Sequence, residues 1–326
     1  MKKRSILKAA LFLAPGFLFI YFLIQSPLDK YFAFQYVGST CYQHGKWILQ
    51  RIEKEKRPID IAFVGSSKTL HAIQDSLLET QLNQRLQKNI HVANLGYCGP
   101  TMNMQYFFVK ELLKHQKPAY LFIEAGFNIA RANHLDFGYV ADWEDIIHSP
   151  QQGAEYRENI QKALTIRLLN IRQKLLHIPE IQAIPQGFYG YAQDNKQATA
   201  EELAAYTQES KQFFSHFHPD KMEAYQRHHK SAFVELAALM KLIPKETKVY
   251  FFLLKEYGMP NECFNKATFL QYAPLLITPD SLWDKNTAWM DRVHLNDQGA
   301  RHYSQWIENE LVSILSKEAP QQSEIK

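Results

Sequence analysis

The sequence is poor in features that define several classes of protein. Its only cysteines are Cys41, Cys98 and Cys263, and this odd number excludes a complete disulfide framework, although one pair outside the cytoplasm would leave one free thiol. Their spacing matches no metal-ligand pattern. The formal net charge is only +4 and no long basic block occurs, so nucleic acid is not an expected partner. No internal repeats are visible.

What remains is an ordinary globular composition. The chain has 326 residues, of which 46% are hydrophobic and 21% charged. This length can bury one sizeable core, or one core that carries an insertion.

The N-terminus has the pattern of a membrane anchor. Cations within the first eight residues precede residues 9–24, which carry no charge. We therefore expect residues 1–27 to form a single-pass transmembrane helix of the inner (cytoplasmic) membrane. Because basic flanks stay in the cytoplasm, its N-terminus would lie inside and the rest of the chain would be periplasmic or extracytoplasmic. One alternative is a cleaved signal peptide, although residues 21–27 contain no small-x-small cleavage site. The other is a helix buried in a cytoplasmic protein.

The middle of the chain has the alternating pattern of an α/β protein. Short apolar runs, each expected to form a strand, occur at 59–64, 90–95, 119–124, 248–254 and 275–278. Helical stretches are expected between and after them, at 70–87, 102–115, 232–242 and 297–315. Such alternation predicts a three-layer α/β/α sandwich with a mainly parallel five-stranded sheet.

A long polar segment interrupts this pattern. We expect a helical insertion at about 131–231 that packs over the sheet edge within a single α/β domain at 28–318. The last residues, 319–326, are expected to form a disordered tail.

Ser67 is a candidate nucleophile. It follows the strand expected at 59–64, and Gly65 would permit a tight turn that exposes its hydroxyl. The simpler alternative is that Ser66 and Ser67 only cap the following helix. Gly65–Ser67 is not a phosphate loop, because the lysine-serine/threonine ending is absent.

Asp291 and His294 are candidate partners for that serine. In an Asp-x-x-His turn, the carboxylate can orient the imidazole, whose other nitrogen then faces the hydroxyl. The alternative is an ordinary surface turn before the last helix, for which Asn296 or Asp297 is the more natural cap.

Gly99 and Asn128 could stabilise an oxyanion. Both follow expected strands, and a glycine N–H and a side-chain amide directed at one point would stabilise developing negative charge. Taken separately, Gly99 fits a turn and Asn128 a helix cap. All the candidates follow strands or the last crossover, where a parallel sheet assembles its sites.

Together these segments resemble the sequence blocks of the SGNH, or GDSL, hydrolase superfamily. The blocks are Gly65-Ser66-Ser67, Asn94-x-x-x-x-Gly99-x-Thr101, Gly126-x-Asn128 and Asp291-x-x-His294. The resemblance covers about residues 61–305 apart from the insertion, and it implies a flavodoxin-like SGNH fold. It also implies that Ser67 is the nucleophile, that Asp291 and His294 complete the triad, and that Gly99 and Asn128 are oxyanion donors.

Ser66 stands where the family usually has an aspartate. This variant resembles membrane-anchored members that modify cell-envelope polymers, including the extracytoplasmic protein of teichoic-acid D-alanylation. The resemblance therefore implies a serine esterase or O-acyltransferase that needs no metal or other cofactor. Its partners would be an acylated carbohydrate or envelope polymer, the membrane, and a multi-span membrane protein that delivers the acyl group. The alternative is a non-catalytic envelope scaffold that keeps the fold.

Three other features have simple explanations. The histidines at 216, 218, 228 and 229 could suggest a metal site, but they fit polar helix ends. Lys68 is expected to be solvated. The aromatic side chains at 188–191 could stack on a sugar, although a packed loop explains them better.

Overall fold

The computed structural model describes most of the chain. The described residues are 2–37, 41–99, 101–125, 133–150, 153–178, 189–215, 230–261, 263, 265–283 and 285–317. Three predictions fall outside them and stay predictions: the oxyanion donor Asn128, the histidines at 216–229 and the tail at 319–326.

The chain divides into two compact units. One contains Met1–Lys46 and Leu135–Ile184, and the other contains Trp47–His134 and Pro185–Lys326. These boundaries differ from the single domain at 28–318, because the first half of the insertion groups with the N-terminal segment.

The second unit is built on a five-stranded sheet in which every strand is parallel to its neighbours. Its strands are β1 (Ile61–Gly65), β2 (Val92–Gly96), β3 (Tyr120–Glu124), β4 (Lys248–Phe252) and β5 (Leu275–Leu276). The predicted α/β class with a mainly parallel five-stranded sheet is confirmed. The order is β2-β1-β3-β4-β5, and the direction of winding reverses between β1 and β3. Ligand sites of open parallel sheets form at such a reversal, outside the carboxyl ends of the strands.

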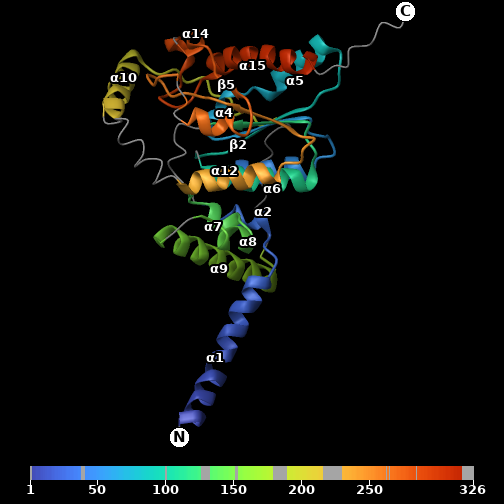
Figure 1. Ribbon diagram of the computed structural model, residues 1–326, viewed down its shortest axis with the longest axis vertical. Coiled ribbons are helices and arrows are strands. Elements are labelled where there is room, and N and C mark those ends of the chain that lie inside the picture. The colour runs from blue at the N-terminus through green and yellow to red at the C-terminus, as the bar shows by residue number, and fades with distance from the viewer. Residues whose placement is uncertain are drawn as a thin grey trace, which may run out of the picture. The chain divides into compact units, whose positions relative to one another are not determined.

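Helices cover both faces of this sheet. Figure 1 shows α5 and α15 on one side of the strands and α6 and α12 on the other. Among the described residues outside the first unit, the helices are α4 (Ser67–Ala72), α5 (Asp75–Leu86), α6 (Met102–His115), α10 (Ala200–Ser215), α12 (Lys230–Leu242), α13 (Lys266–Leu270), α14 (Asp280–Trp283), η1 (Asn286–Ala288) and α15 (Asp297–Lys317). Helix α3 (Cys41–Glu53) runs from the first unit into the second.

The single helix predicted at 70–87 is wrong, because the structure has two helices there. Ile73 leaves the helical conformation, with φ −101° and ψ 102°. The Gln74 N–H donates to the Ser304 hydroxyl (2.9 Å), and its side-chain amide donates to Asp297 Oδ1 (2.9 Å). Both partners belong to α15, so a tertiary contact ends α4 and sets the start of α5.

An aromatic ladder crosses one face of the sheet. Phe63 on β1 is the register partner of Phe122 on β3, which in turn pairs with Tyr250 on β4. The ring centroids are 4.9 Å apart for the first pair and 5.2 Å for the second. Cross-strand aromatic pairs of this kind stabilise the sheet and fix its register.

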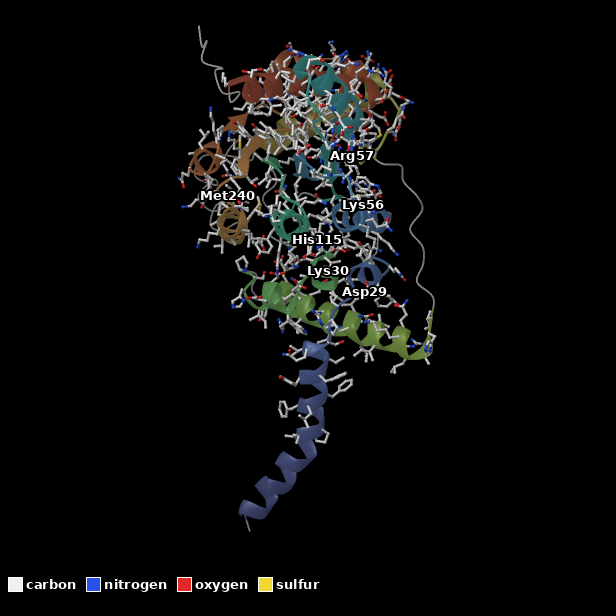
Figure 2. The ribbon with its side chains drawn as sticks, turned by 90° about the vertical axis from the view of Figure 1, so that its right-hand side faces the viewer. Asp29, Lys30, Lys56, Arg57, His115 and Met240 are labelled. Atoms are coloured by element: carbon white, nitrogen blue, oxygen red, sulfur yellow. The ribbon has the colours of Figure 1, made fainter. Side chains whose placement is uncertain are left out.

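The first unit is helical. Its helices are α1 (Lys2–Gln25), α2 (Lys30–Ala33), α7 (Phe137–Val140), α8 (Trp143–Ile147) and α9 (Gly153–Leu176). Helix α9 packs against the other four. Asp29 caps α2 by accepting the Phe32 N–H (3.1 Å), and Lys30 lies 3.4 Å from Asp142; Figure 2 labels Asp29 and Lys30.

Helix α1 coincides with the predicted anchor. The side chains of residues 13–22 are exposed, which is incompatible with burial of that stretch in the fold. Among the described residues, however, no helix meets the length and apolarity needed to cross a bilayer. The transmembrane part of the predicted fold is therefore unsupported by the structure.

Replacing Phe122 by alanine should lower the free energy of unfolding by about 3–5 kcal/mol, because it empties the middle of the aromatic ladder. Urea denaturation of the purified protein measures this. Leu270→Ala is the control, since Leu270 is 50% exposed and should change stability by no more than about 0.5 kcal/mol. Equal losses for the two variants would contradict the role of the ladder.

Candidate active site

Ser67 lies at the carboxyl edge of the sheet, at the β1/β3 reversal. It is the first residue of α4, and Ser66 is the N-cap, whose side chain accepts the Lys68 N–H (3.1 Å). Ser66 is buried, whereas Ser67 is partly exposed. The capping role considered for both serines is thus taken by Ser66.

A tight turn before α15 carries Asp291 and His294, the other two residues of the predicted triad. A β-bridge between Trp289 and Leu295 closes this turn, and the His294 carbonyl accepts the Met290 N–H (3.0 Å). Trp289 is completely buried and fixes one end of the turn in the core. Asn296 caps α15 by accepting the Gly299 N–H (3.0 Å). Asp291 is consequently not needed as a helix cap.

The three predicted residues form a hydrogen-bonded chain. His294 Nε2 lies 2.8 Å from Ser67 Oγ, and His294 Nδ1 lies 2.9 Å from Asp291 Oδ2. These distances suit a general base facing a hydroxyl, with a carboxylate behind the base. In this arrangement Asp291 favours the tautomer in which Nδ1 carries the proton and Nε2 can accept one.

Asp291 is held in its ionised form. Burial alone would raise its pKa, but the His294 side chain and the backbone N–H groups of Val293 (2.7 Å) and His294 (2.8 Å) outweigh burial and lower the pKa to about 2. A depressed carboxyl pKa stabilises the fold above the ordinary value of 3.8, and this contribution is lost as the pH falls through about 2. Acid inactivation at milder pH would therefore not come from Asp291.

A second histidine lies beside the triad. The rings of His71 and His294 have centroids 5.0 Å apart. Burial lowers the pKa of His71, and the proximity of His294 lowers it further. His71 therefore favours its neutral form, which keeps a second positive charge away from the imidazole of His294.

Gly99 occupies a turn that only glycine fits well. Its φ is +88°, and a Cβ there would lie 2.7 Å from His134 Nε2. The same nitrogen lies 2.7 Å from the Cys98 carbonyl oxygen. Cys98 is disulfide-bonded and Cys263 is a buried free thiol, in agreement with one pair and one free cysteine. Gly99 follows β2 at the same edge as Ser67, while its role as an oxyanion donor stays a prediction.

Asn94, from the second block, has a structural position. It is completely buried in β2, and its amide donates to the carbonyls of Thr69 (3.0 Å) and Ile73 (2.8 Å). These carbonyls belong to α4 and its C-cap, where the last carbonyls of a helix have no N–H partner within the helix. Asn94 therefore fixes the helix that carries Ser67 against β2.

Two buried charged residues, Lys68 and Glu124, lie behind the serine, and the sequence motifs assigned neither a role in the site. The expectation that Lys68 is solvated is wrong: it is 4% exposed, its Nζ donates to the Leu254 carbonyl (2.9 Å), and it lies 3.4 Å from Glu124 Oε1. Glu124 ends the apolar strand β3. A carboxylate on the last residue of a buried strand was the available signal.

The aromatic loop is packed where it is described. The Tyr189 hydroxyl donates to Glu79 (3.1 Å), and the Tyr191 hydroxyl donates to Asp297 (3.2 Å). Asp75 accepts the Gly190 N–H (2.8 Å). These two tyrosines thus have the structural role that was the alternative to sugar stacking.

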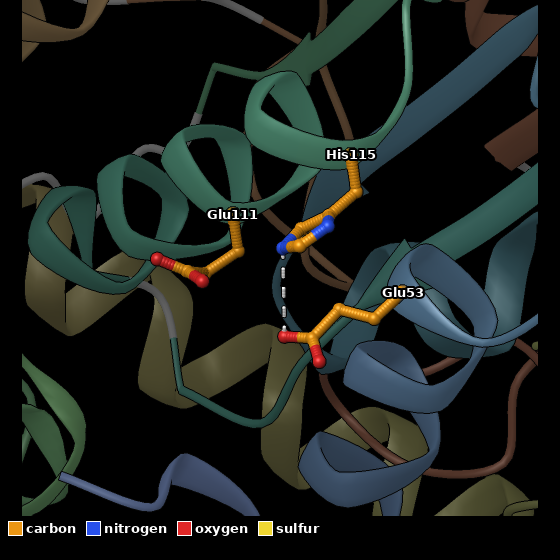
Figure 3. A group of neighbouring side chains, drawn as sticks. All are labelled: Glu53, Glu111 and His115. Carbon is orange, nitrogen blue, oxygen red and sulfur yellow. Dashed lines mark ion pairs between the residues drawn. The ribbon is translucent and has the colours of Figure 1, made fainter. Parts of the chain in front are cut away.

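One group among the described residues could in principle hold a metal ion. The ligand atoms of Glu53, Glu111 and His115 lie within 4.8 Å of one another (Figure 3). Glu111 already has a cation, since Lys114 Nζ lies 2.7 Å away. Helix α6 leads away from the carboxyl edge and places His115 near the start of β3. The group is therefore separate from the triad and gives no argument for a bound ion.

Comparison of the chain with protein-family models and with curated proteins finds no match.

Replacing Asp291 by asparagine should slow the reaction of Ser67 with a fluorophosphonate probe by on the order of 10³–10⁴-fold, because an amide no longer stabilises the required tautomer or the imidazolium. A labelling time course on the purified protein measures this. Arg292→Gln is the matched control in the same turn. The Arg292 side chain is 43% exposed and pairs with Glu209 (3.3 Å) and Glu256 (3.5 Å). It is hydrogen-bonded to neither Ser67 nor His294, so we expect a change of less than about threefold. Similar rates for Asp291→Asn and the natural chain would remove Asp291 from the triad.

Proposed function

We propose that this protein is a membrane-attached, extracytoplasmic serine hydrolase of the SGNH type that acts on acyl esters. The observation that carries the proposal is the hydrogen-bonded chain from Asp291 through His294 to Ser67, with 2.8 Å between His294 Nε2 and Ser67 Oγ. The resemblance of the four sequence blocks, two of which contain these three residues, adds support.

The reaction proceeds in two steps through an acyl-serine. Ser67 Oγ attacks the ester carbonyl while His294 Nε2 takes the hydroxyl proton, and the carbonyl π electrons move onto oxygen. Collapse of this intermediate breaks the bond to the leaving alcohol, which receives the proton from His294. Water or a second hydroxyl then attacks the acyl-serine, with His294 again as base, and Ser67 recovers its proton.

The negative charge of the tetrahedral intermediate requires donors. In the proposal these are the N–H groups of Ser67 and Gly99 and the side-chain amide of Asn128. Each such donor typically contributes about 3–4 kcal/mol to transition-state stabilisation. Every step uses groups of this chain, so the proposed mechanism needs no metal ion or organic cofactor.

The acceptor determines the outcome. Attack by water makes the protein an esterase, whereas attack by a carbohydrate hydroxyl makes it an O-acyltransferase. The Ser66 variant of the first block and the membrane attachment favour envelope glycans or polymers as substrates, with a multi-span membrane protein as a donor of acyl groups. This choice of substrate depends on the family resemblance.

Attachment to the membrane is proposed through α1. Large apolar side chains there are solvent-exposed, with Phe17 at 68%, Leu18 at 67% and Phe22 at 62%. Contiguous exposed apolar surface of this kind is uncommon in soluble proteins and is typical of membrane or protein contacts. The basic residues before it favour an N-terminus on the cytoplasmic side.

A non-catalytic envelope scaffold is the second candidate. It would need the same fold but would have no use for a serine held against an imidazole. A separation beyond about 4–5 Å between Ser67 Oγ and His294 would favour that candidate. The 2.8 Å distance favours the hydrolase.

Ser67→Ala should abolish labelling by a fluorophosphonate and hydrolysis of a small acyl ester, because the attacking oxygen is removed. Ser66→Ala is the neighbouring control, since it keeps that oxygen and should still be labelled, although more slowly. Mass spectrometry of the labelled peptide locates the modified serine. Labelling that survives in Ser67→Ala would refute the proposed nucleophile.

Removal of residues 1–22 should move the protein from the membrane fraction to the soluble fraction. This deletion removes the exposed apolar side chains of α1, Phe22 included, but keeps Leu23, which is buried. A carbonate wash of the membranes distinguishes an inserted chain from a peripherally bound one. Retention of the shortened protein in washed membranes would show that α1 is not the anchor.

A further inference from the structure

A buried carboxylate lies directly behind the proposed nucleophile. Glu124 is 1% exposed, and its oxygens accept the backbone N–H of Ser66 (2.7 Å) and the Ser66 hydroxyl (2.8 and 2.9 Å). They also accept the Thr69 hydroxyl (2.6 Å). These donors stand on both sides of Ser67 in the sequence. One side chain from β3 therefore holds the segment that carries the reactive hydroxyl.

Gly65 provides the room for this carboxylate. A Cβ at Gly65 would collide with Thr69 Oγ1 and would lie 2.6 Å from Glu124 Oε2. Gly65 is not among the described residues with positive φ. The sequence had suggested that Gly65 permits a tight turn, but this turn does not require the conformational freedom of glycine. The glycine is needed because a side chain at this position would leave no space for the carboxylate.

Lys68 balances the charge of Glu124. Its Nζ lies 3.4 Å from Glu124 Oε1 and donates to the carbonyl of Leu254, just beyond β4. A buried ion pair is tolerated only when its remaining polar atoms are also hydrogen-bonded, and the serine and threonine hydroxyls meet that need. The network joins the carboxyl ends of the adjacent strands β1, β3 and β4.

We propose that Glu124 is the positioning residue of the nucleophile. It acts through Ser66 and Thr69, which fix the backbone of Ser67 so that its hydroxyl meets His294 and its N–H faces the oxyanion. This inference rests on the proposed serine chemistry. A misplacement of 1 Å at a reacting atom can slow a reaction by about 10²-fold, so small movements of this segment matter.

The competing explanation is that Glu124 and Lys68 only stabilise the fold. The two explanations differ for a variant that removes both charges together. Replacing a whole buried ion pair by neutral side chains is often neutral for stability, whereas breaking it leaves an uncompensated charge. Restored charge balance would not, however, restore a carboxylate acceptor for Ser66 and Thr69.

The experiment compares Glu124→Gln, Lys68→Met and the double variant in the full-length protein. Each is tested for its midpoint of thermal unfolding and for its second-order rate of labelling by a fluorophosphonate. Both single variants should unfold at lower temperature. The double variant should regain most of the midpoint yet stay slower in labelling by about 10²-fold. Thr69→Val is a milder variant that removes one hydrogen-bond donor to Glu124 without any change of charge. It should still fold, and its labelling should be several-fold slower.

The outcomes separate the two proposals. A double variant that regains both the midpoint and the natural labelling rate overturns the positioning role, as does a natural rate in Glu124→Gln. If the double variant does not fold, a natural rate in Thr69→Val overturns it. Absence of Ser67 labelling in the natural protein refutes the proposed function itself. If Ser67→Ala abolishes labelling but the Glu124 variants are labelled at the natural rate, only the positioning role is refuted.

Discussion

The hydrogen bond between His294 and Ser67 is the contact on which the functional interpretation depends. It joins residues 227 positions apart in the chain, so no local structure can produce it. Two separate constraints bring the partners together. β1 delivers the serine to the carboxyl edge of the sheet, and the turn closed by the Trp289–Leu295 bridge delivers the histidine. Each constraint is set by the core, because β1 and Trp289 are both buried.

Buried polar groups complete what apolar packing begins. The amide of Asn94 satisfies carbonyls at the end of α4, and the carboxylate of Glu124 satisfies donors at its start. A helix of only six residues has little stability of its own. It is held at both ends by side chains from β2 and β3, and these contacts fix the position of the Ser67 backbone.

The sequence was sufficient for features that follow from local pattern. Apolar runs located all five strands to within a few residues, and the spacing of Asp291 and His294 predicted their mutual contact, because an Asp-x-x-His turn is short enough to allow it. Features set by tertiary contacts were not predictable in this way. The break between α4 and α5 depends on Gln74 meeting α15. Burial of Lys68 depends on Glu124, which lies 56 positions further along the chain. No periodicity in the sequence predicts an ion pair between residues so far apart.

Ser66 and Ser67 show how environment separates two identical neighbours. Ser66 faces the interior, where its hydroxyl donates to Glu124 and accepts the Lys68 N–H; a hydroxyl so engaged between a carboxylate and a backbone amide is poorly placed to attack. Ser67 faces the edge of the sheet, where its oxygen meets an imidazole. In the resembled family the residue before the nucleophile is usually an aspartate. Here that carboxylate would stand against Glu124, and like charges buried in contact are strongly unfavourable. With a glutamate at position 124, a neutral residue that can form hydrogen bonds is therefore favoured at position 66.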